Sequence, residues 1–170
     1  MPSRRVATNL SSGTYYLTLT IQRWYYLFDR YNRYNRWQIL ADSLRYCLEH
    51  KGLELNGYVF MLNHIHLIAT SPDMAGFLRD FKRFTSVKFI SNLEITEPSV
   101  LKLFVDDDGK YRFWMATNAP KKIETFAFYK QKLTYIHENP VRKAYVAKPE
   151  HWLWSSANPT PPLAVWFLSA

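Results

Sequence analysis

Residues 53–72 read LELNGYVFMLNHIHLIATSP, and this stretch decides the fold. Two apolar runs, 53–62 and 64–70, are separated only by Asn63, and a Ser-Pro pair ends the second run. Runs of this length, rich in β-branched and aromatic residues and bounded by turn residues, are typical of β-strands. The sequence therefore predicts two antiparallel strands joined by a tight turn.

Strand and helix patterns flank this hairpin. Residues 14–24, TYYLTLTIQRW, alternate roughly and predict a strand. Residues 35–50 and 75–92 each carry apolar side chains at three- and four-residue spacing, and Gly52 follows the first segment. This spacing predicts two amphipathic helices, the first ended by the glycine.

The C-terminal half has a less regular pattern. Residues 100–105 predict a short strand, with which residues 111–114 could pair after an Asp-Asp-Asp-Gly turn. Residues 123–137 predict a helix. That helix is expected to end before Pro140, because proline disfavours the helical conformation of the preceding Asn139.

The order of strand, helix, two strands and helix, with no internal repeat, predicts an α/β or α+β sandwich. It resembles the ferredoxin-like or RNA-recognition-like arrangement, in which helices pack on one face of an antiparallel sheet. A chain of 170 residues fits one domain. We expect that domain over residues 1–158 and a flexible C-terminal tail, rich in proline, over residues 159–170.

The charge and the aromatic content of the chain indicate which kind of partner it binds. Lys and Arg number 22 against 14 Asp and Glu, which gives a net charge of +8, and the chain holds 12 Tyr, 11 Phe and 6 Trp. Cationic and aromatic side chains together are typical of proteins that bind single-stranded nucleic acid, although most of these rings are expected in the core. No apolar run approaches the roughly 20 residues that cross a bilayer, so no membrane partner is predicted.

The single cysteine, Cys47, excludes an internal disulfide and any zinc site built from cysteine pairs. The N-terminal residues contain no apolar stretch of signal-peptide length. Both observations favour a cytoplasmic location.

One predicted helix is strongly basic. Arg79, Lys82, Arg83 and Lys88 occupy the faces of the 75–92 helix that its apolar residues leave free. These four side chains could follow a DNA backbone, or they could form an ordinary solvated face.

His64 and His66 flank Ile65 in the second strand of the hairpin. Side chains two residues apart on a strand project from the same face, so both imidazoles could reach one divalent ion. The alternative is that both are hydrogen-bonded polar residues at a sheet edge.

Three blocks of sequence resemble a known family. Residues 58–68, YVFMLNHIHLI, are similar to the strand, turn and histidine pair of HUH-type single-tyrosine transposases. Residues 135–142, YIHENPVR, followed by the 154–157 block WSSA, are similar to the corresponding blocks of the REP-associated tyrosine transposases. The resemblance extends from about Gly13 to Ala157 and implies the HUH nuclease architecture.

The resemblance implies a divalent-metal nuclease and strand transferase that acts on single-stranded DNA, with a hairpin or palindromic strand as its substrate. Tyr135 would be the nucleophile that forms a 5′-phosphotyrosine intermediate, with Tyr129 as the rival. The implied metal is Mg²⁺ or Mn²⁺, and histidine ligation favours Mn²⁺.

The ligand set implied by the resemblance starts with His64 and His66. Relatives draw a third, polar ligand from the nucleophile helix about one turn after the tyrosine, and Asn139 has that spacing. Because Asn139 precedes a proline, it could instead cap the helix, with His137 or Glu138 approaching the metal.

Arg142 and Lys143 follow the nucleophile closely and could hold phosphates beside the cleaved bond, or they could simply offset the dipole at the end of the helix.

Two positions depart from the family pattern. Leu62 stands where relatives have a proline in the turn, and Ala119 stands where many carry a histidine.

Two other functions remain open at this stage. A non-catalytic or domesticated protein of the same fold would bind single-stranded nucleic acid without cutting it. A small metal-binding or structural protein would bind a cation but show no salt-sensitive affinity for DNA. A homodimer is possible, because relatives in the superfamily are often dimeric.

Overall fold

The computed structural model describes residues 10–170. Its strands are β1 (Gly13–Thr20), β2 (Glu54–Phe60), β3 (His64–Ser71) and β4 (Lys121–Lys122), and its α-helices are α1 (Arg36–His50), α2 (Met74–Thr96), α3 (Pro98–Leu101) and α4 (Phe126–Arg142). Short 3₁₀ turns cover Gln22–Trp24, Lys102–Phe104 and Pro149–His151. No helix within the described residues is long and apolar enough to cross a membrane.

The four strands form one antiparallel sheet in the order β2-β3-β1-β4. The predicted hairpin of β2 and β3 is confirmed, as are the strand that becomes β1 and the helices that become α1 and α2. β4 was not predicted, because a strand of two exposed lysines has no recognisable pattern.

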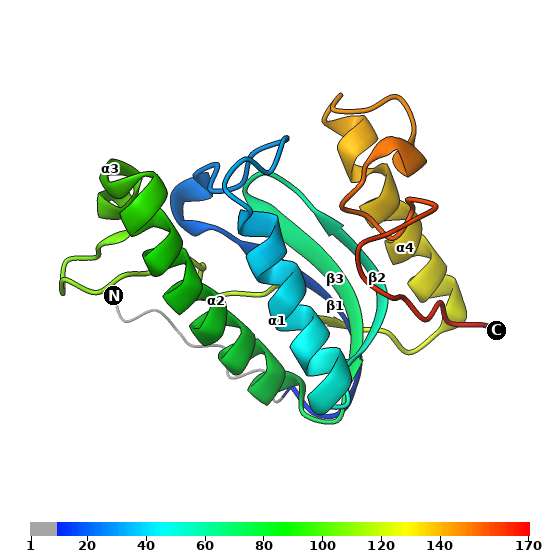
Figure 1. Cartoon of the computed structure of the whole chain (residues 1–170). Coiled ribbons are helices and arrows are strands. Elements are labelled where there is room, and N and C mark those ends of the chain that lie inside the picture. The colour runs from blue at the N-terminus through cyan, green and yellow to red at the C-terminus, as the bar shows by residue number, and fades with distance from the viewer. Residues whose placement is uncertain (1–9) are drawn as a thin grey trace.

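The helices cover both faces of the sheet (Figure 1). α1 and α2 pack side by side on one face, as predicted, whereas α4 lies on the other face over β2 and β3. The α+β class is confirmed, and the expectation that all helices share one face is wrong. The sequence pattern of α4 indicated an apolar stripe but could not indicate which face of the sheet it covers.

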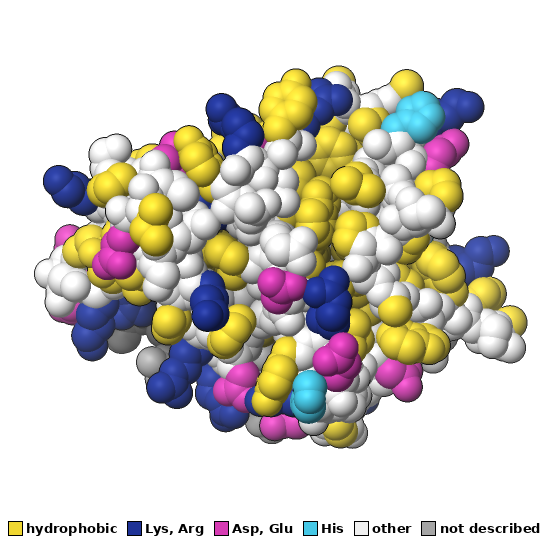
Figure 2. Space-filling view, in the orientation of Figure 1, with side chains coloured by type: hydrophobic (Ala, Val, Ile, Leu, Met, Phe, Trp, Pro, Cys, Tyr) yellow, Lys and Arg dark blue, Asp and Glu magenta, His cyan; other side chains and the backbone are white. Residues whose placement is uncertain are grey.

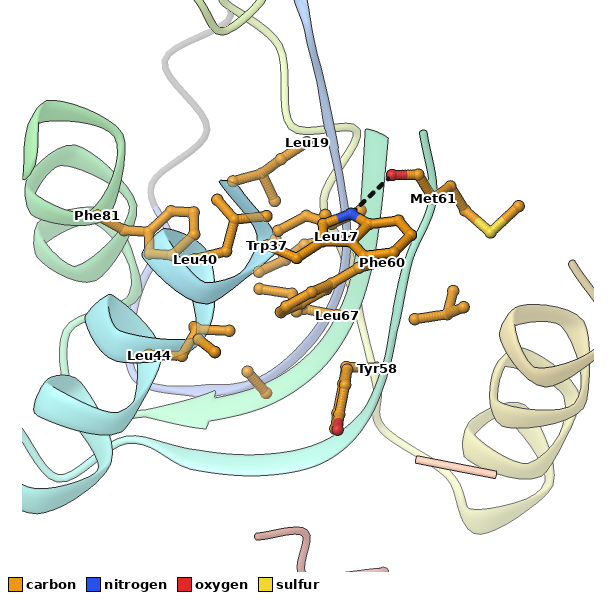
Figure 3. Close-up of a cluster of buried hydrophobic side chains, with 14 of the residues drawn as sticks. Leu17, Leu19, Trp37, Leu40, Leu44, Tyr58, Phe60, Met61, Leu67 and Phe81 are labelled. Carbon is orange, nitrogen blue, oxygen red and sulfur yellow. Dashed lines mark hydrogen bonds between the residues drawn. The ribbon is translucent and has the colours of Figure 1, made fainter. Parts of the chain in front are cut away.

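The main core lies between the sheet and the α1–α2 layer (Figure 3). Leu17 and Leu67 project from neighbouring strands toward Trp37 of α1, and all three are at most 1% exposed. The Trp37 indole nitrogen donates a hydrogen bond to the Met61 carbonyl at 3.2 Å, which satisfies the one polar atom of that ring. The core therefore fixes the turn that precedes β3.

Two details of the C-terminal half correct the sequence prediction. Residues 100–104 form helical turns instead of a strand, because Pro98 starts α3 and the buried side chains, Leu101 and Phe104, are three residues apart. The predicted pairing with residues 111–114 is confirmed only at Val105, which forms an isolated β-bridge with Tyr111. α4 continues through Pro140 to Arg142, so Pro140 does not end the helix.

The last part of the chain packs against β2 and α4. Trp154 is buried and stacks on Phe60 with ring centroids 5.6 Å apart, and the Phe60 amide donates to the Trp154 carbonyl. Within the segment 159–170, the Trp166 amide donates to the Leu55 carbonyl at 2.8 Å. Residues 159–170 therefore pass along the outer edge of β2 in the described structure. The expected division into a domain and a flexible tail stays a prediction.

Candidate active site

The histidine pair lies on the sheet face that α4 covers. His64 and His66 project from β3 on the same side, and Ile65 between them is fully buried on the opposite side. Their ring centroids are 4.8 Å apart. In the antiparallel register, Thr18 of β1 lies opposite His66. The two-residue period of the strand thus brings both imidazoles together, as the sequence predicts.

The Nδ1 atom of each ring has a close oxygen partner. His64 Nδ1 lies 2.7 Å from Asn63 Oδ1, and His66 Nδ1 lies 3.0 Å from Thr18 Oγ1 and 3.1 Å from the Tyr16 hydroxyl. With the proton on Nδ1, each ring donates to these oxygens and leaves the Nε2 lone pair facing away from them, toward α4 in the case of His64. Metal-binding histidines in proteins have this arrangement.

Both imidazoles are held neutral. Burial lowers the pKa of His64 to about 4, and the positive charge of Lys143 acts in the same direction. Burial also lowers the pKa of His66 to about 3, with further contributions from His64 and Arg142. At neutral pH both side chains are therefore neutral imidazoles, which is the form that binds metal.

α4 brings Asn139 and Tyr135 to the histidine pair. The two side chains are four residues apart and so share one face of the helix. Asn139 is 5% exposed, and its amide Nδ2 lies 3.5 Å from His64 Nε2. The Tyr135 ring centroid lies 5.8 Å from that of His66.

Asn139 keeps its helical conformation although a proline follows it. Asn139 and Pro140 are both buried residues of α4. Tertiary packing therefore outweighs the local preference that predicted a helix end here. As a result, Asn139 lies on the same helical face as Tyr135, without capping the helix.

A glycine in β2 allows α4 to approach the sheet closely. A Cβ atom at Gly57 would lie 2.6 Å from Leu133 Cδ1 and 3.3 Å from Ile136 Cδ1. The absence of a side chain there lets the helix residues on either side of Tyr135 rest on the strand.

Cations surround the phenol ring of Tyr135. The Arg142 guanidinium carbon lies 4.2 Å from the ring centroid, and Lys132 Nζ lies 5.7 Å from it. Arg142 also donates to the Tyr135 backbone carbonyl at 2.7 Å. The ring is 46% exposed, so it is accessible to a large substrate.

These residues line an open hollow with a volume of about 690 Å³. No acidic side chain lines the hollow, and four cationic side chains do: Lys121, Lys132, Arg142 and Lys143. A hollow with this charge attracts anions, and a phosphodiester is one of them.

The residues present fit a divalent ion. Within residues 10–170 no group of three or more His, Cys, Asp or Glu side chains is placed to hold a metal, so neither His137 nor Glu138 completes a site with the histidine pair. His137 Nε2 is instead bonded to Ser156 Oγ at 2.7 Å. Two neutral imidazoles and the Asn139 amide remain, and these nitrogen and oxygen donors could hold a divalent first-row ion such as Mn²⁺ more readily than Mg²⁺, which prefers oxygen ligands.

The rival tyrosine faces away from the hollow. Tyr129 is 1% exposed, and its hydroxyl donates to the Asn56 carbonyl at 2.8 Å and accepts from the Leu168 amide at 3.2 Å. Burial raises the pKa of Tyr129. Its contacts are those of a structural side chain.

The basic residues of α2 are not brought to this hollow, because α2 packs on the other face of the sheet (Figure 1). Lys82 is partly buried and donates to the Met115 carbonyl at 2.9 Å, and Arg79 pairs with Asp80. Arg83 and Lys88 are exposed. On the α1–α2 face, basic, acidic and hydrophobic side chains are intermixed (Figure 2).

Sequence reasoning did not identify several residues of the hollow. Tyr16 and Thr18 contact His66, and Trp24 and Lys132 line the hollow. The alternation of β1 indicates that Tyr16 and Thr18 share a face, but only the register with β3 places them beside His66. Lys132 could have been found from its spacing, one helical turn before Tyr135.

Comparison with known proteins shows a likeness to a solved structure. No protein-family model matches the sequence, and no curated protein matches it. A solved structure of a REP-associated tyrosine transposase bound to a REP hairpin is similar over 86% of this chain and 78% of that chain, with a TM-score of 0.64 and 18% sequence identity. The predicted fold is thereby confirmed: the chain shares the fold of that REP-associated tyrosine transposase.

Proposed function

We propose that this protein is a metal-dependent endonuclease and strand transferase that cleaves single-stranded DNA beside a hairpin, as a transposase does. The observation that carries the proposal is the meeting of His64, His66 and Tyr135 in one hollow lined by cations. The fold shared with a transposase bound to a REP hairpin supports hairpin DNA as the substrate class.

In the proposed reaction, the Tyr135 phenol loses its proton and its oxygen bonds to the phosphorus of a phosphodiester. The bond from phosphorus to the 3′ oxygen of the upstream nucleotide breaks, and that oxygen takes up a proton and leaves as a hydroxyl. The downstream strand stays attached to the enzyme through a 5′-phosphotyrosine. In the reverse step a 3′-hydroxyl attacks this linkage and joins strands.

His64, His66 and Asn139 would hold the metal in this scheme. A phenol with a pKa near 10 is a weak nucleophile at neutral pH, so the phosphate must be made more reactive. A Mg²⁺ or Mn²⁺ ion held by these residues would supply positive charge to the phosphate oxygens and so make the phosphorus more reactive.

The cations of the hollow would position the DNA. Arg142 lies against Tyr135 and offers a guanidinium to the phosphate under attack, while Lys143 and Lys132 flank it. Arg79, Lys82, Arg83 and Lys88 stay predicted backbone contacts for DNA that extends to the other face of the molecule. Lys82 would first have to release the Met115 carbonyl.

A second function is favoured by one residue of the hollow. Ala119 lines it at the position where many members of the resembled family carry a histidine. If that histidine is essential to cleavage, the protein would be a non-catalytic hairpin-binding protein, acting in the cytoplasm either alone or as a homodimer.

The test is a cleavage assay on a labelled DNA oligonucleotide that carries a hairpin with single-stranded flanks. With Mn²⁺ the wild-type protein is expected to cut the flank, and His64→Ala and His66→Ala should each abolish cutting. His50→Ala is the matched control, because His50 is exposed at the end of α1, away from the hollow. Equal cleavage in EDTA, or by His64→Ala, would contradict the proposal, and binding without cleavage would favour the second function.

A further inference from the structure

The turn after β1 exposes a tryptophan beside the histidine pair. Trp24 is 59% exposed and lines the same hollow as His64 and Tyr135. Because a large part of this aromatic side chain is exposed, it is accessible to a partner that enters the hollow.

The backbone holds Trp24 in an unfavourable conformation. Arg23 has a φ angle of 55° and Trp24 one of 59°, both in the left-handed region that bulky side chains avoid. The Trp24 amide donates to the backbone carbonyl of the fully buried Ile21, and the next amide, of Tyr25, donates to the Gln22 carbonyl. Strained and well-anchored turns of this kind cluster at functional sites.

Asn63 ties this turn to the metal-binding residues. Its side-chain nitrogen donates to the Trp24 carbonyl at 3.3 Å, and its side-chain oxygen lies 2.7 Å from His64 Nδ1. One amide therefore fixes the position of Trp24 relative to His64. The backbone of Trp24 is thereby held beside the hollow that its side chain lines.

The surroundings of Trp24 indicate what it binds. The cationic side chains that line the hollow suit a phosphate backbone, and the flat exposed indole suits a partner with an apolar face. An unpaired nucleotide has both parts, a charged phosphate and a planar base. A duplex would offer its phosphates while keeping its bases stacked inside, so it would leave the indole without a partner.

We infer that Trp24 is a stacking site for one unpaired base of the single strand, next to the phosphate presented to Tyr135. The inference rests on the proposed function, which makes single-stranded DNA the substrate. Trp24 would be a positioning residue: it holds a neighbouring base and so fixes where along the strand the reactive phosphate lies.

The experiment measures equilibrium binding by fluorescence anisotropy, in EDTA, of a labelled hairpin oligonucleotide with single-stranded flanks. Stacking on an aromatic side chain accounts for roughly five- to 150-fold in affinity, so Trp24→Ala should weaken binding by a factor in this range, and Trp24→Phe should weaken it less. Trp166→Ala is the matched control, because Trp166 is 53% exposed and does not line the hollow. It should bind as the wild type does.

An abasic scan of the flank identifies the base. At one position, removal of the base should weaken binding by the wild type but have no further effect on Trp24→Ala. Equal affinity of Trp24→Ala and Trp166→Ala, or effects that simply add at every position, would overturn the inference and leave the proposed nuclease intact. A wild type that does not bind the oligonucleotide would overturn both, and a loss of affinity in Trp24→Ala without any cleavage by the wild type would overturn only the nuclease.

Discussion

The two tyrosines of α4 give the sharpest prediction, because the same substitution should have opposite consequences at the two positions. Tyr129→Phe removes a buried hydroxyl that bonds the Asn56 carbonyl and the Leu168 amide. Leaving buried partners without a hydrogen bond costs about 1–3 kcal/mol. For a chain of this length, each kcal/mol of lost stability lowers the melting temperature by roughly 2–4 °C. Tyr135→Phe removes a hydroxyl from a half-exposed ring and should change stability by less than about 0.5 kcal/mol.

Urea denaturation of both variants measures the stability difference, and the hairpin cleavage assay with Mn²⁺ measures function. We expect Tyr129→Phe to be less stable and to cut DNA, and Tyr135→Phe to be as stable as the wild type and inactive. Wild-type cleavage by Tyr135→Phe would refute the assignment of the nucleophile. Loss of cleavage in a folded Tyr129→Phe protein would refute the structural role given to Tyr129.

Three further predictions concern the surroundings of the site. Burial lowers the pKa of Lys82 from 10.5 to about 8, so between these pH values the unfolded chain holds a proton that the folded chain releases. The unfolding free energy of the wild type should therefore rise by up to about 3 kcal/mol as the pH increases over this range. Urea denaturation at several pH values should show a smaller rise for Lys82→Met. The same dependence on pH in both proteins would contradict the burial of Lys82. Asn63→Ala removes the partner of His64 Nδ1 and should weaken Mn²⁺ binding about 10- to 100-fold by calorimetry, whereas unchanged affinity would show that Asn63 does not orient the ring. Trp24→Gly removes the Cβ atom that makes the left-handed conformation unfavourable, so it should raise the unfolding free energy by about 1 kcal/mol while weakening DNA binding. Trp24→Ala keeps the Cβ atom, so a Trp24→Ala protein as stable as Trp24→Gly would argue against backbone strain at this position.

Much of the fold could be predicted because short-range patterns carry it. The three- and four-residue spacing of apolar side chains indicates α1 and α2, and the two apolar runs around Asn63 indicate β2 and β3. The run 100–105 was ambiguous, because a short apolar segment fits a strand or a helical turn equally well. Which face α4 covers depends on the close approach at Gly57, a contact between distant segments that no local pattern records.

The site was predictable where it lies within one element. The strand period brings His64 and His66 together, and the helix period brings Tyr135 and Asn139 together. The contacts between elements were not predictable from spacing. Thr18 meets His66 only through the register of β1 with β3, and Asn139 stays helical only because tertiary packing outweighs the proline that follows it.

Mapping the covalent adduct tests the central claim most directly. Trypsin separates the two candidate tyrosines, because residues 123–130 (IETFAFYK) contain Tyr129 and residues 133–142 (LTYIHENPVR) contain Tyr135. After incubation with the hairpin oligonucleotide and Mn²⁺, followed by nuclease and trypsin digestion, the mass of a nucleotide should appear on the peptide 133–142 alone. It should be absent in EDTA and in the His64→Ala protein. Cleaved DNA without an adduct on this peptide would contradict the account.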